Sequence, residues 1–209
     1  MTSPAPIQPA TSIHLSRAAD IIRGGGVIVY PTETVYGLGA NPFDPNALNR
    51  IFCIKQRDLG KAVILLIRGE DDLDRLAAEV PPTAHYLMEA FWPGPLTLVF
   101  KADPDLPQGL LGTSSTIALR TSDAPIAQDL LARVGGPVTS TSANLSGHPP
   151  ARSAIEAASQ MGDRVDLILD GGTLPDARPS TIVNVASEKA SIIRVGRISK
   201  EAIHHVMNI

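Results

Sequence analysis

The chain alternates between short apolar runs and longer segments in which apolar residues recur every three or four positions. The short runs predict buried strands at residues 27–30, 62–67, 96–101, 114–120, 137–139, 165–170, 180–185 and 190–194. The longer segments predict helices at residues 13–23, 45–56, 71–79, 81–91, 124–134 and 153–161, with a short final helix after Ser199. Strands that alternate with helices in this way indicate an α/β fold.

Local signals mark where several of these helices begin and end. Asp44 followed by Pro45 is typical of a helix N-terminus, and Ser153 with Glu156 forms a capping box. The three glycines at 24–26 end the first helix before a strand begins. A phosphate-binding loop is the alternative for these glycines, but no G-x-x-x-x-G-K-[ST] pattern follows them. We therefore interpret them as a helix C-terminus.

The length and composition favour one folded domain. The chain has 209 residues, of which 44% are apolar, and this is enough for a sizeable core. Residues 1–12 are rich in proline and small polar residues and show no periodicity. We expect a disordered N-terminal tail at residues 1–12 and a folded domain at residues 13–209.

The charge balance and the cysteine content exclude some classes of protein. The chain has 18 Lys and Arg against 21 Asp and Glu, so its surface as a whole is not suited to tracking phosphates along a nucleic acid. Cys53 is the only cysteine, which rules out an intrachain disulfide and suits a reducing compartment. Because no apolar run is long enough to cross a bilayer and no signal peptide pattern is present, we expect a cytoplasmic protein without membrane contact.

The segment from residue 27 to residue 39 is the best candidate for the floor of a small-molecule site. Its strand ends at Pro31, and hydroxyls, a carboxylate, a phenol and two glycines follow directly. In open α/β sheets, ligands bind beyond the carboxyl ends of strands. A dinucleotide-binding turn at Gly37-Leu38-Gly39 is not expected, because Pro42 prevents a helix from opening there. Tyr36 is either a general acid or a buried ring with a bonded hydroxyl.

Cations gather at the end of the second predicted helix. Lys55, Arg57 and Lys61 come directly before an apolar strand, so they lie at one end of that strand. A basic helix C-terminus that complements the helix dipole is the ordinary explanation. Three cations in so short a segment can also hold phosphates, and we keep both interpretations.

Other basic and hydroxyl-bearing residues also follow predicted strands. Thr116 and Arg120 share one face of a strand, and an arginine at a strand end can bind a carboxylate or phosphate with its planar fork. Hydroxyls and an amide crowd the segment 140–146. With Ser180 and Arg194, these groups indicate a local pocket for a small anion such as a nucleotide.

Other chemistries have weaker support in the sequence. No G-x-S-x-G elbow is present, so none of the serines is expected to act as a hydrolase nucleophile. The five histidines show no metal-ligand spacing, and His204-His205 is interpreted as solvated. Trp92, the only tryptophan, is expected to pack in the core or a turn. No protein-bound metal site is therefore expected.

At these residues the sequence resembles the YrdC-like family, whose members include threonylcarbamoyl-AMP synthases. The resemblance runs from about Leu15 to Ser199 and rests on five ordered motifs. These are Pro31-Thr-Glu-Thr-Val-Tyr-Gly-Leu-Gly39, Lys55-x-Arg57, Trp92-Pro-Gly-Pro-Leu-Thr97, Ser142-Ala-Asn-Leu-Ser-Gly147 and Ser180-Thr-Ile-Val183. The resemblance implies a twisted, open, mixed α/β sheet with flanking helices and a deep basic cavity. Because the chain ends soon after Arg194, we expect the single-domain form of the family.

The resemblance also implies a reaction. L-threonine, bicarbonate and ATP, which enters with Mg²⁺ bound through its phosphates, would give threonylcarbamoyl-adenylate and pyrophosphate. A partner complex would then transfer the threonylcarbamoyl group to adenosine in tRNA. By the same resemblance, threonine is held by Thr34, Arg120, Ser140 and Ser180. The nucleotide is held by Arg57, Lys61, Thr116, Ser142, Asn144 and Arg194. Lys55 and Arg57 are the expected catalytic residues.

The sequence departs from the family pattern at four places, and two alternatives to the synthase follow. Asp58, Lys61-Ala62, Leu66 and Pro179 replace residues that many members carry, and these changes bear mainly on the contacts to threonine. One alternative is therefore a related enzyme with a different amine substrate. The other is an RNA-binding protein that uses the same basic cavity, but the chain has few aromatic side chains for base stacking.

Overall fold

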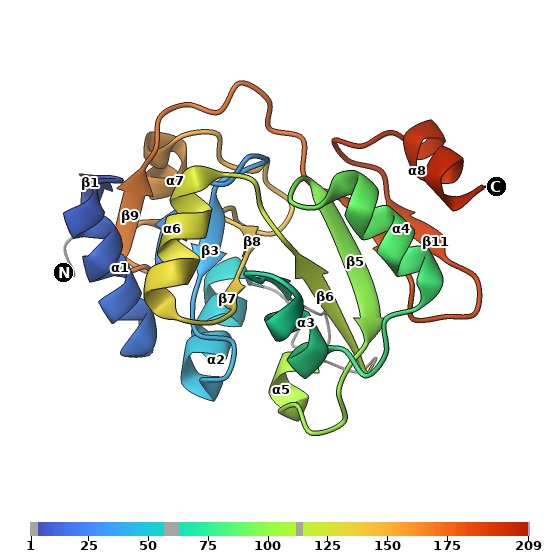
Figure 1. Cartoon of the computed structure of the whole chain (residues 1–209). Coiled ribbons are helices and arrows are strands. Elements are labelled where there is room, and N and C mark those ends of the chain that lie inside the picture. The colour runs from blue at the N-terminus through green and yellow to red at the C-terminus, as the bar shows by residue number, and fades with distance from the viewer. Residues whose placement is uncertain (1–3, 57–62, 112–114, 209) are drawn as a thin grey trace.

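The fold is built from two mixed β-sheets with helices packed against them. A computed structural model describes residues 4–56, 63–111 and 115–208. In these ranges, eleven strands form a five-stranded sheet, ordered β1-β9-β2-β3-β8, and a six-stranded sheet, ordered β11-β10-β5-β6-β4-β7. Figure 1 shows the two sheets side by side, with α1, α6 and α7 beside the first and α4 and α8 beside the second. The α/β class expected from the sequence is confirmed, but the strands divide between two sheets.

The first sheet combines parallel and antiparallel pairs. Its strands are β1 (Ile7–Pro9), β2 (Ile28–Tyr30), β3 (Gly37–Gly39), β8 (Thr141–Ser142) and β9 (Leu167–Asp170). β9 pairs in parallel with both β1 and β2, whereas β3 is antiparallel to β2 and to β8. The segment 31–36 therefore forms the connection of a β2–β3 hairpin, with both of its ends fixed by strand pairing.

Helices cover both faces of the first sheet. The helices α1 (Ser12–Arg23) and α6 (Pro125–Val134) pack on one face, where Ile28, Tyr30 and Leu167 point. The helices α2 (Pro45–Lys55) and α7 (Ala154–Met161) pack on the other, with Val29 and Leu38. Burial on both faces explains why the strands of this sheet are apolar without alternation.

Most helices that pack against the second sheet lie on one of its faces. Its strands are β4 (Ile64–Leu66), β5 (Leu96–Lys101), β6 (Thr116–Arg120), β7 (Val138–Thr139), β10 (Thr181–Asn184) and β11 (Ser191–Arg194). Alternate residues such as Leu98, Phe100 and Leu119 join a core with residues of α3 (Glu70–Leu76), α4 (Pro82–Phe91), α5 (Gln108–Leu111) and α8 (Lys200–Met207). The residues between them, such as Val99 and Ala118, point to the opposite face and line a cavity. At the end of β4 this face is covered, since Leu66 packs with residues of α1 and α6, and the cavity borders the rest.

The capping signals read from the sequence are present in the structure. The Asp44 carboxylate accepts hydrogen bonds from the backbone N–H groups of Asn46 and Ala47. Ser153 and Ser199 cap α7 and α8 with their side-chain oxygens. Gly24 is the C-cap of α1, and Gly25 has a φ of 82°, a conformation that glycine adopts without strain. The Asp44 cap fixes the start of α2, the helix whose last residue is Lys55. The Ser153 cap fixes the start of α7.

The prediction of a disordered tail is wrong for part of residues 1–12. Residues Ile7–Pro9 form β1, which pairs with β9, and the side chain of Ala5 is buried. This strand is held by backbone hydrogen bonds to a distant strand, so the composition of the segment gives no sign of it. Prolines are tolerated there because β1 lies at the edge of the sheet.

Three further short elements were not predicted. α5 lies in the expected loop at 103–112, and β3 and β8 lie in segments interpreted as loops. In β3, Gly39 is required by packing, because a Cβ atom there would lie 2.8 Å from the Tyr30 ring carbon Cε1. Gly39 therefore makes room for a buried ring. Among the described residues, no helix is both long and apolar enough to cross a bilayer.

Candidate active site

A cavity of about 580 Å³ lies between the loops of the first sheet and the face of the second sheet opposite α3, α4, α5 and α8. Ile64, Val99, Ala118 and Ile182, from four strands of the second sheet, form an apolar floor. Polar and cationic side chains surround this floor. They include Thr34, Lys55, Arg120, Ser140, Ser142, Asn144, Ser146, Ser180 and Arg194. The arrangement suits a ligand with both polar and apolar parts.

The loop after β2 presents Thr34 to this cavity. The Thr32 hydroxyl accepts hydrogen bonds from the backbone N–H groups of Thr34 and Val35, and it donates to the Val35 carbonyl oxygen at 2.7 Å. Since Thr32 and Thr34 are both buried, these bonds fix the loop in one conformation. Arg120 Nη1 donates to Thr34 Oγ1 at 2.9 Å. A buried guanidinium and a hydroxyl thus lie side by side in the cavity wall.

Lys55 fixes the loop that follows β8. Its side chain is 5% exposed, and Nζ donates to the backbone carbonyl oxygens of Ser142 and Asn144, the latter at 3.0 Å. The Lys55 carbonyl oxygen in turn accepts from the Ser146 hydroxyl at 2.6 Å. The Asn144 amide donates to the carbonyl oxygens of Leu145 and His148. The C-terminus of α2 and the 142–148 loop are therefore one hydrogen-bonded unit.

Ser180 and Arg194 come together on the far side of the cavity. Arg194 Nη2 donates to the Ser180 carbonyl oxygen at 2.9 Å, and the hydroxyls of Ser180 and Thr97 lie 2.8 Å apart. Thr97 is on β5, and Ser180 directly precedes β10, its parallel neighbour in the sheet. Strand pairing therefore places both hydroxyls, and Arg194 of β11 follows from the antiparallel β10–β11 pair.

Ser140 lies where the chain passes from one sheet to the other. It separates β7, in the second sheet, from β8, in the first, and its backbone N–H donates to the Ile64 carbonyl oxygen at 2.7 Å. Nearby, the Tyr30 hydroxyl donates to the Thr139 carbonyl oxygen at 3.1 Å. Complete burial raises the pKa of Tyr30 above its ordinary value, with a hydrogen bond from Ser140 acting in the opposite direction. Tyr30 is therefore a neutral hydrogen-bond donor at physiological pH.

The cavity brings together eight of the eleven residues that the sequence singled out. They are Thr34, Lys55, Arg120, Ser140, Ser142, Asn144, Ser180 and Arg194. Thr116 does not line it; this residue pairs with Lys101 at the start of β6, two residues before Ala118. Arg57 and Lys61 lie outside the described residues, as do Asp58 and Ala62.

Several other residues of the sequence analysis are also placed by the structure. Tyr36 is a buried ring whose hydroxyl donates to the Gly172 carbonyl oxygen at 2.7 Å, and burial raises its pKa. Trp92 packs against the core and donates from Nε1 to the Leu96 carbonyl oxygen. Leu66 is buried in the core beside Tyr30, whereas Pro179 lines the cavity. Of the departures from the family pattern in the described ranges, only Pro179 reaches the cavity.

The sequence did not single out the apolar floor or the buried carboxylate behind the cavity wall. The floor residues could have been found from the two-residue alternation of the strands, once each strand had been assigned an inner face. The carboxylate of Glu33 contacts Arg120 and Ser122, which are remote from it in sequence. Only the fold reveals that pairing.

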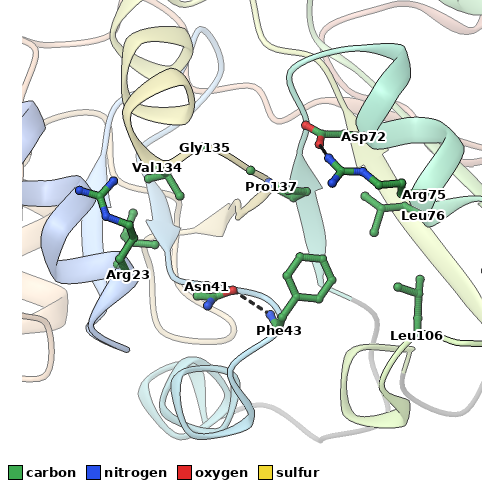
Figure 2. Close-up of a pocket in the computed structure, with 12 residues that line it drawn as sticks. Arg23, Asn41, Phe43, Asp72, Arg75, Leu76, Leu106, Val134, Gly135 and Pro137 are labelled. Carbon is green, nitrogen blue, oxygen red and sulfur yellow. Dashed lines mark hydrogen bonds and ion pairs between the residues drawn. The ribbon is translucent and has the colours of Figure 1, made fainter.

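A second cavity, of about 420 Å³, lies elsewhere in the molecule and contains none of the predicted site residues. Figure 2 shows the Phe43 ring pointing into it, with Pro137, Leu76 and Leu106 around the ring. Arg75, at its edge, is paired with Asp72. The two arginines of its lining, Arg23 and Arg75, already pair with aspartates, so this cavity is less suited to an anionic ligand than the first.

No group of three or more metal-ligating side chains occurs in the described ranges 4–56, 63–111 and 115–208. The donors that line the main cavity are hydroxyl, amide, ammonium and guanidinium groups. Such a donor set suits a polyanion, and a divalent cation would enter as a complex with that polyanion.

Comparison with known proteins connects this cavity to one family. The Sua5/YciO/YrdC family model, described as "Telomere recombination", matches residues 20–196. A threonylcarbamoyl-AMP synthase of Vibrio cholerae is 40% identical over 176 residues, which are 83% of this chain and 94% of that protein. The range that the family model matches includes every segment that lines the cavity. The match to the Vibrio cholerae protein extends over most of the chain.

Relatives from Pyrococcus abyssi are longer. Its threonylcarbamoyl-AMP synthase is 37% identical over 190 residues, which are 91% of this chain but 56% of that protein. The crystal structure of P. abyssi Sua5 complexed with L-threonine superposes with a TM-score of 0.91 at 34% identity, covering 99% of this chain and 61% of that one. Because the family model matches residues 20–196 and relatives agree in sequence and fold over most of the chain, the chain belongs to the Sua5/YciO/YrdC family.

Proposed function

We propose that this protein is a threonylcarbamoyl-AMP synthase, which forms threonylcarbamoyl-adenylate and pyrophosphate from L-threonine, bicarbonate and ATP. Relatives that bear this name are 37% and 40% identical to it. The observation that carries the proposal is the convergence of Thr34, Arg120, Ser180 and Arg194 on one cavity. These residues come from four separate segments of the chain, so their meeting is not a local property of any one motif.

Threonine would bind at the wall formed by Thr34, Arg120, Ser140 and Ser180. Arg120 is buried, and its guanidinium suits a carboxylate, with which it can form paired hydrogen bonds. The hydroxyls of Thr34 and Ser180 can each donate or accept, so they suit an ammonium, an amine or an alcohol. The Pyrococcus abyssi protein has been crystallised with L-threonine, which supports this class of ligand.

ATP would bind toward Ser142, Asn144 and Arg194. Lys55 and the 142–148 loop form a hydrogen-bonded unit there, which presents the Ser142 hydroxyl to phosphate oxygens. Arg57, Lys61 and Thr116 complete the proposed nucleotide site. Mg²⁺ would be held mainly by the phosphates of ATP, where it neutralises charge on the departing pyrophosphate.

The chain's own residues would assist by holding reactants and stabilising charge. The threonine amine adds to carbon dioxide derived from bicarbonate, and the carbamate oxygen then attacks the α-phosphate of ATP while pyrophosphate leaves. Arg57 would stabilise the charge that develops on the phosphates, and Lys55 would act with it by fixing the 142–148 loop. No covalent intermediate with the enzyme is needed.

The product would be consumed by a tRNA-modifying partner complex. Threonylcarbamoyl-adenylate is a mixed anhydride, so a transferase must pass its acyl group to the adenosine amine of tRNA before water attacks it. We place this chemistry in the cytoplasm.

An omission series with purified protein tests the proposal. Pyrophosphate release is measured with ATP, Mg²⁺, bicarbonate and L-threonine, and again with each component left out. Release should require all of them, and Arg57→Ala or Ser142→Ala should lower it at least about 100-fold, as expected when a charge-stabilising contact is lost. Glu79→Gln, which alters an exposed ion pair with Lys101, should leave it unchanged. Equal release without threonine would reject threonine as the amine substrate.

A further inference from the structure

The buried carboxylate of Glu33 contacts Arg120 and Ser122 behind the wall of the main cavity. Its Oε1 lies 3.3 Å from Arg120 Nη1, and the two side chains are 10% and 4% exposed. Its Oε2 accepts a hydrogen bond from the Ser122 hydroxyl. Glu33 does not line the cavity, whereas Arg120 does. The Glu33 carboxylate can therefore act on a bound ligand through Arg120, its ion-pair partner.

The Arg120 guanidinium is held on two sides. Nη1 donates to Thr34 Oγ1 and also faces the Glu33 carboxylate. In contrast, Nε of Arg120 is buried and has no hydrogen-bond partner among the described residues. A buried N–H without an acceptor is costly, so its acceptor is expected to come with a ligand. Glu33 Oε1 likewise has no hydrogen-bond partner among these residues, so its contact with Arg120 is an ion pair.

The main chain of Glu33 also connects the cavity wall to the C-terminal strand pair. Its carbonyl oxygen accepts from Arg197 Nη1, and Arg197 follows β11, which carries Arg194. The backbone N–H of Arg197 donates to the Pro179 carbonyl oxygen at 2.9 Å, next to Ser180. The loop that carries Thr34 and the segment that carries Ser180 are thus tied together behind the cavity.

We infer that Glu33 is a positioning residue, which orients the Arg120 guanidinium for the carboxylate of the amino-acid substrate and balances its buried positive charge. The inference rests on the proposed function for the identity of that substrate. A buried guanidinium without a counterion would be unstable or would turn toward other acceptors, and Glu33 prevents both outcomes. Ser122 supports the arrangement by holding the second carboxylate oxygen.

The test compares Glu33→Gln, Glu33→Ala and Ser122→Ala with the wild-type protein. Steady-state kinetics give kcat and the KM values for threonine and ATP, and titration calorimetry gives the Kd of threonine without turnover. Glu33→Ala should raise the threonine KM and Kd at least about 10-fold, as for other residues that orient a binding group. Glu33→Gln should have a smaller effect, Ser122→Ala the smallest, and the ATP KM should stay within about twofold throughout. Glu79→Gln is the matched control, since it neutralises a carboxylate in an exposed ion pair.

A double-mutant cycle separates positioning from general stability. If Glu33 acts through Arg120, then Glu33→Gln should have little further effect on threonine binding in an Arg120→Lys background. Additive effects, or a threonine KM that is unchanged in Glu33→Ala, would overturn the inference while leaving the proposed function intact. A wild-type protein that neither binds threonine nor requires it for pyrophosphate release would overturn the proposed function, and this inference with it. Thermal melts verify that each variant is folded.

Discussion

Lys55 Nζ lies 3.0 Å from the backbone carbonyl oxygen of Asn144, and both residues are buried. The ammonium group also donates to the Ser142 carbonyl oxygen, so one side chain holds two points of the same loop. This relationship gives Lys55 a structural task in addition to its proposed part in catalysis. A lysine in this motif thus shapes the place where phosphates are proposed to bind.

Lys55→Met should reduce both stability and activity. The substitution keeps most of the side-chain volume but leaves buried carbonyl oxygens without a donor, which costs about 1–3 kcal/mol. We also expect pyrophosphate release to fall at least about 10-fold, because the 142–148 loop is no longer fixed. Urea unfolding and the pyrophosphate assay measure the two effects. Lys101→Met, which removes an exposed ion pair, is the control, and equal behaviour of the two variants would contradict the assignment.

Arg120→Lys should impair threonine binding although the charge is kept. Lysine lacks the planar fork that binds a carboxylate through two hydrogen bonds, and it cannot reach Thr34 in the same way. The threonine KM should rise about 10-fold or more, which corresponds to about 1.4 kcal/mol or more, with a smaller change for ATP. A threonine KM that stays at the wild-type value would place the substrate carboxylate elsewhere.

Tyr30→Phe should change how stability depends on alkaline pH. Burial raises the pKa of Tyr30 above 10.0, its ordinary value, so the folded state retains this proton where the unfolded state loses it. The contribution of Tyr30 to the free energy of unfolding is complete below pH 10 and declines at higher pH, by up to about 1.4 kcal/mol per pH unit. Denaturant titrations between about pH 8 and pH 11 should show a shallower decline for Tyr30→Phe, because phenylalanine does not titrate. An unchanged slope would mean that Tyr30 ionises equally in both states.

Asp44→Ala should destabilise the fold without altering the chemistry. The Asp44 carboxylate caps α2 by accepting from Asn46 and Ala47, and loss of such a cap costs about 1 kcal/mol. Asp74→Ala, at an exposed position within α3, should have a smaller effect on the same thermal melt. Because Asp44 is remote from the lining of the main cavity, the threonine and ATP KM values should not change. A large kinetic effect would contradict this separation.

The sequence predicts the longer elements well because their signals are local. β5 is observed over its predicted range, Leu96–Lys101, and α1, α2, α6 and α7 begin and end within one residue of prediction. The strands β1, β3 and β8 were missed because they have only two or three residues and depend on pairing with distant strands. The division into two sheets is likewise a property of pairing, which no local pattern reports.

The main-cavity residues could be proposed from the sequence because they occur in motifs at the ends of strands. What the sequence could not give is how those motifs contact one another. The bonds from Lys55 to Asn144 and from Ser122 to Glu33 both join residues more than eighty positions apart. Thr116 shows the same limit, since it shares a strand with Arg120 but is not among the residues that line the cavity, so its place in the nucleotide site stays a prediction.

The position of the main cavity between two sheets has a consequence for the intact fold. A substrate that contacts Thr34 or Ser142 on one side and Ser180 or Arg194 on the other acts as a removable cross-link between the sheets. Its binding then adds to the free energy of unfolding, by about 2.7 kcal/mol when the ligand is present at 100 times its Kd. A high substrate concentration would therefore offset part of the free energy of unfolding that a destabilising substitution removes.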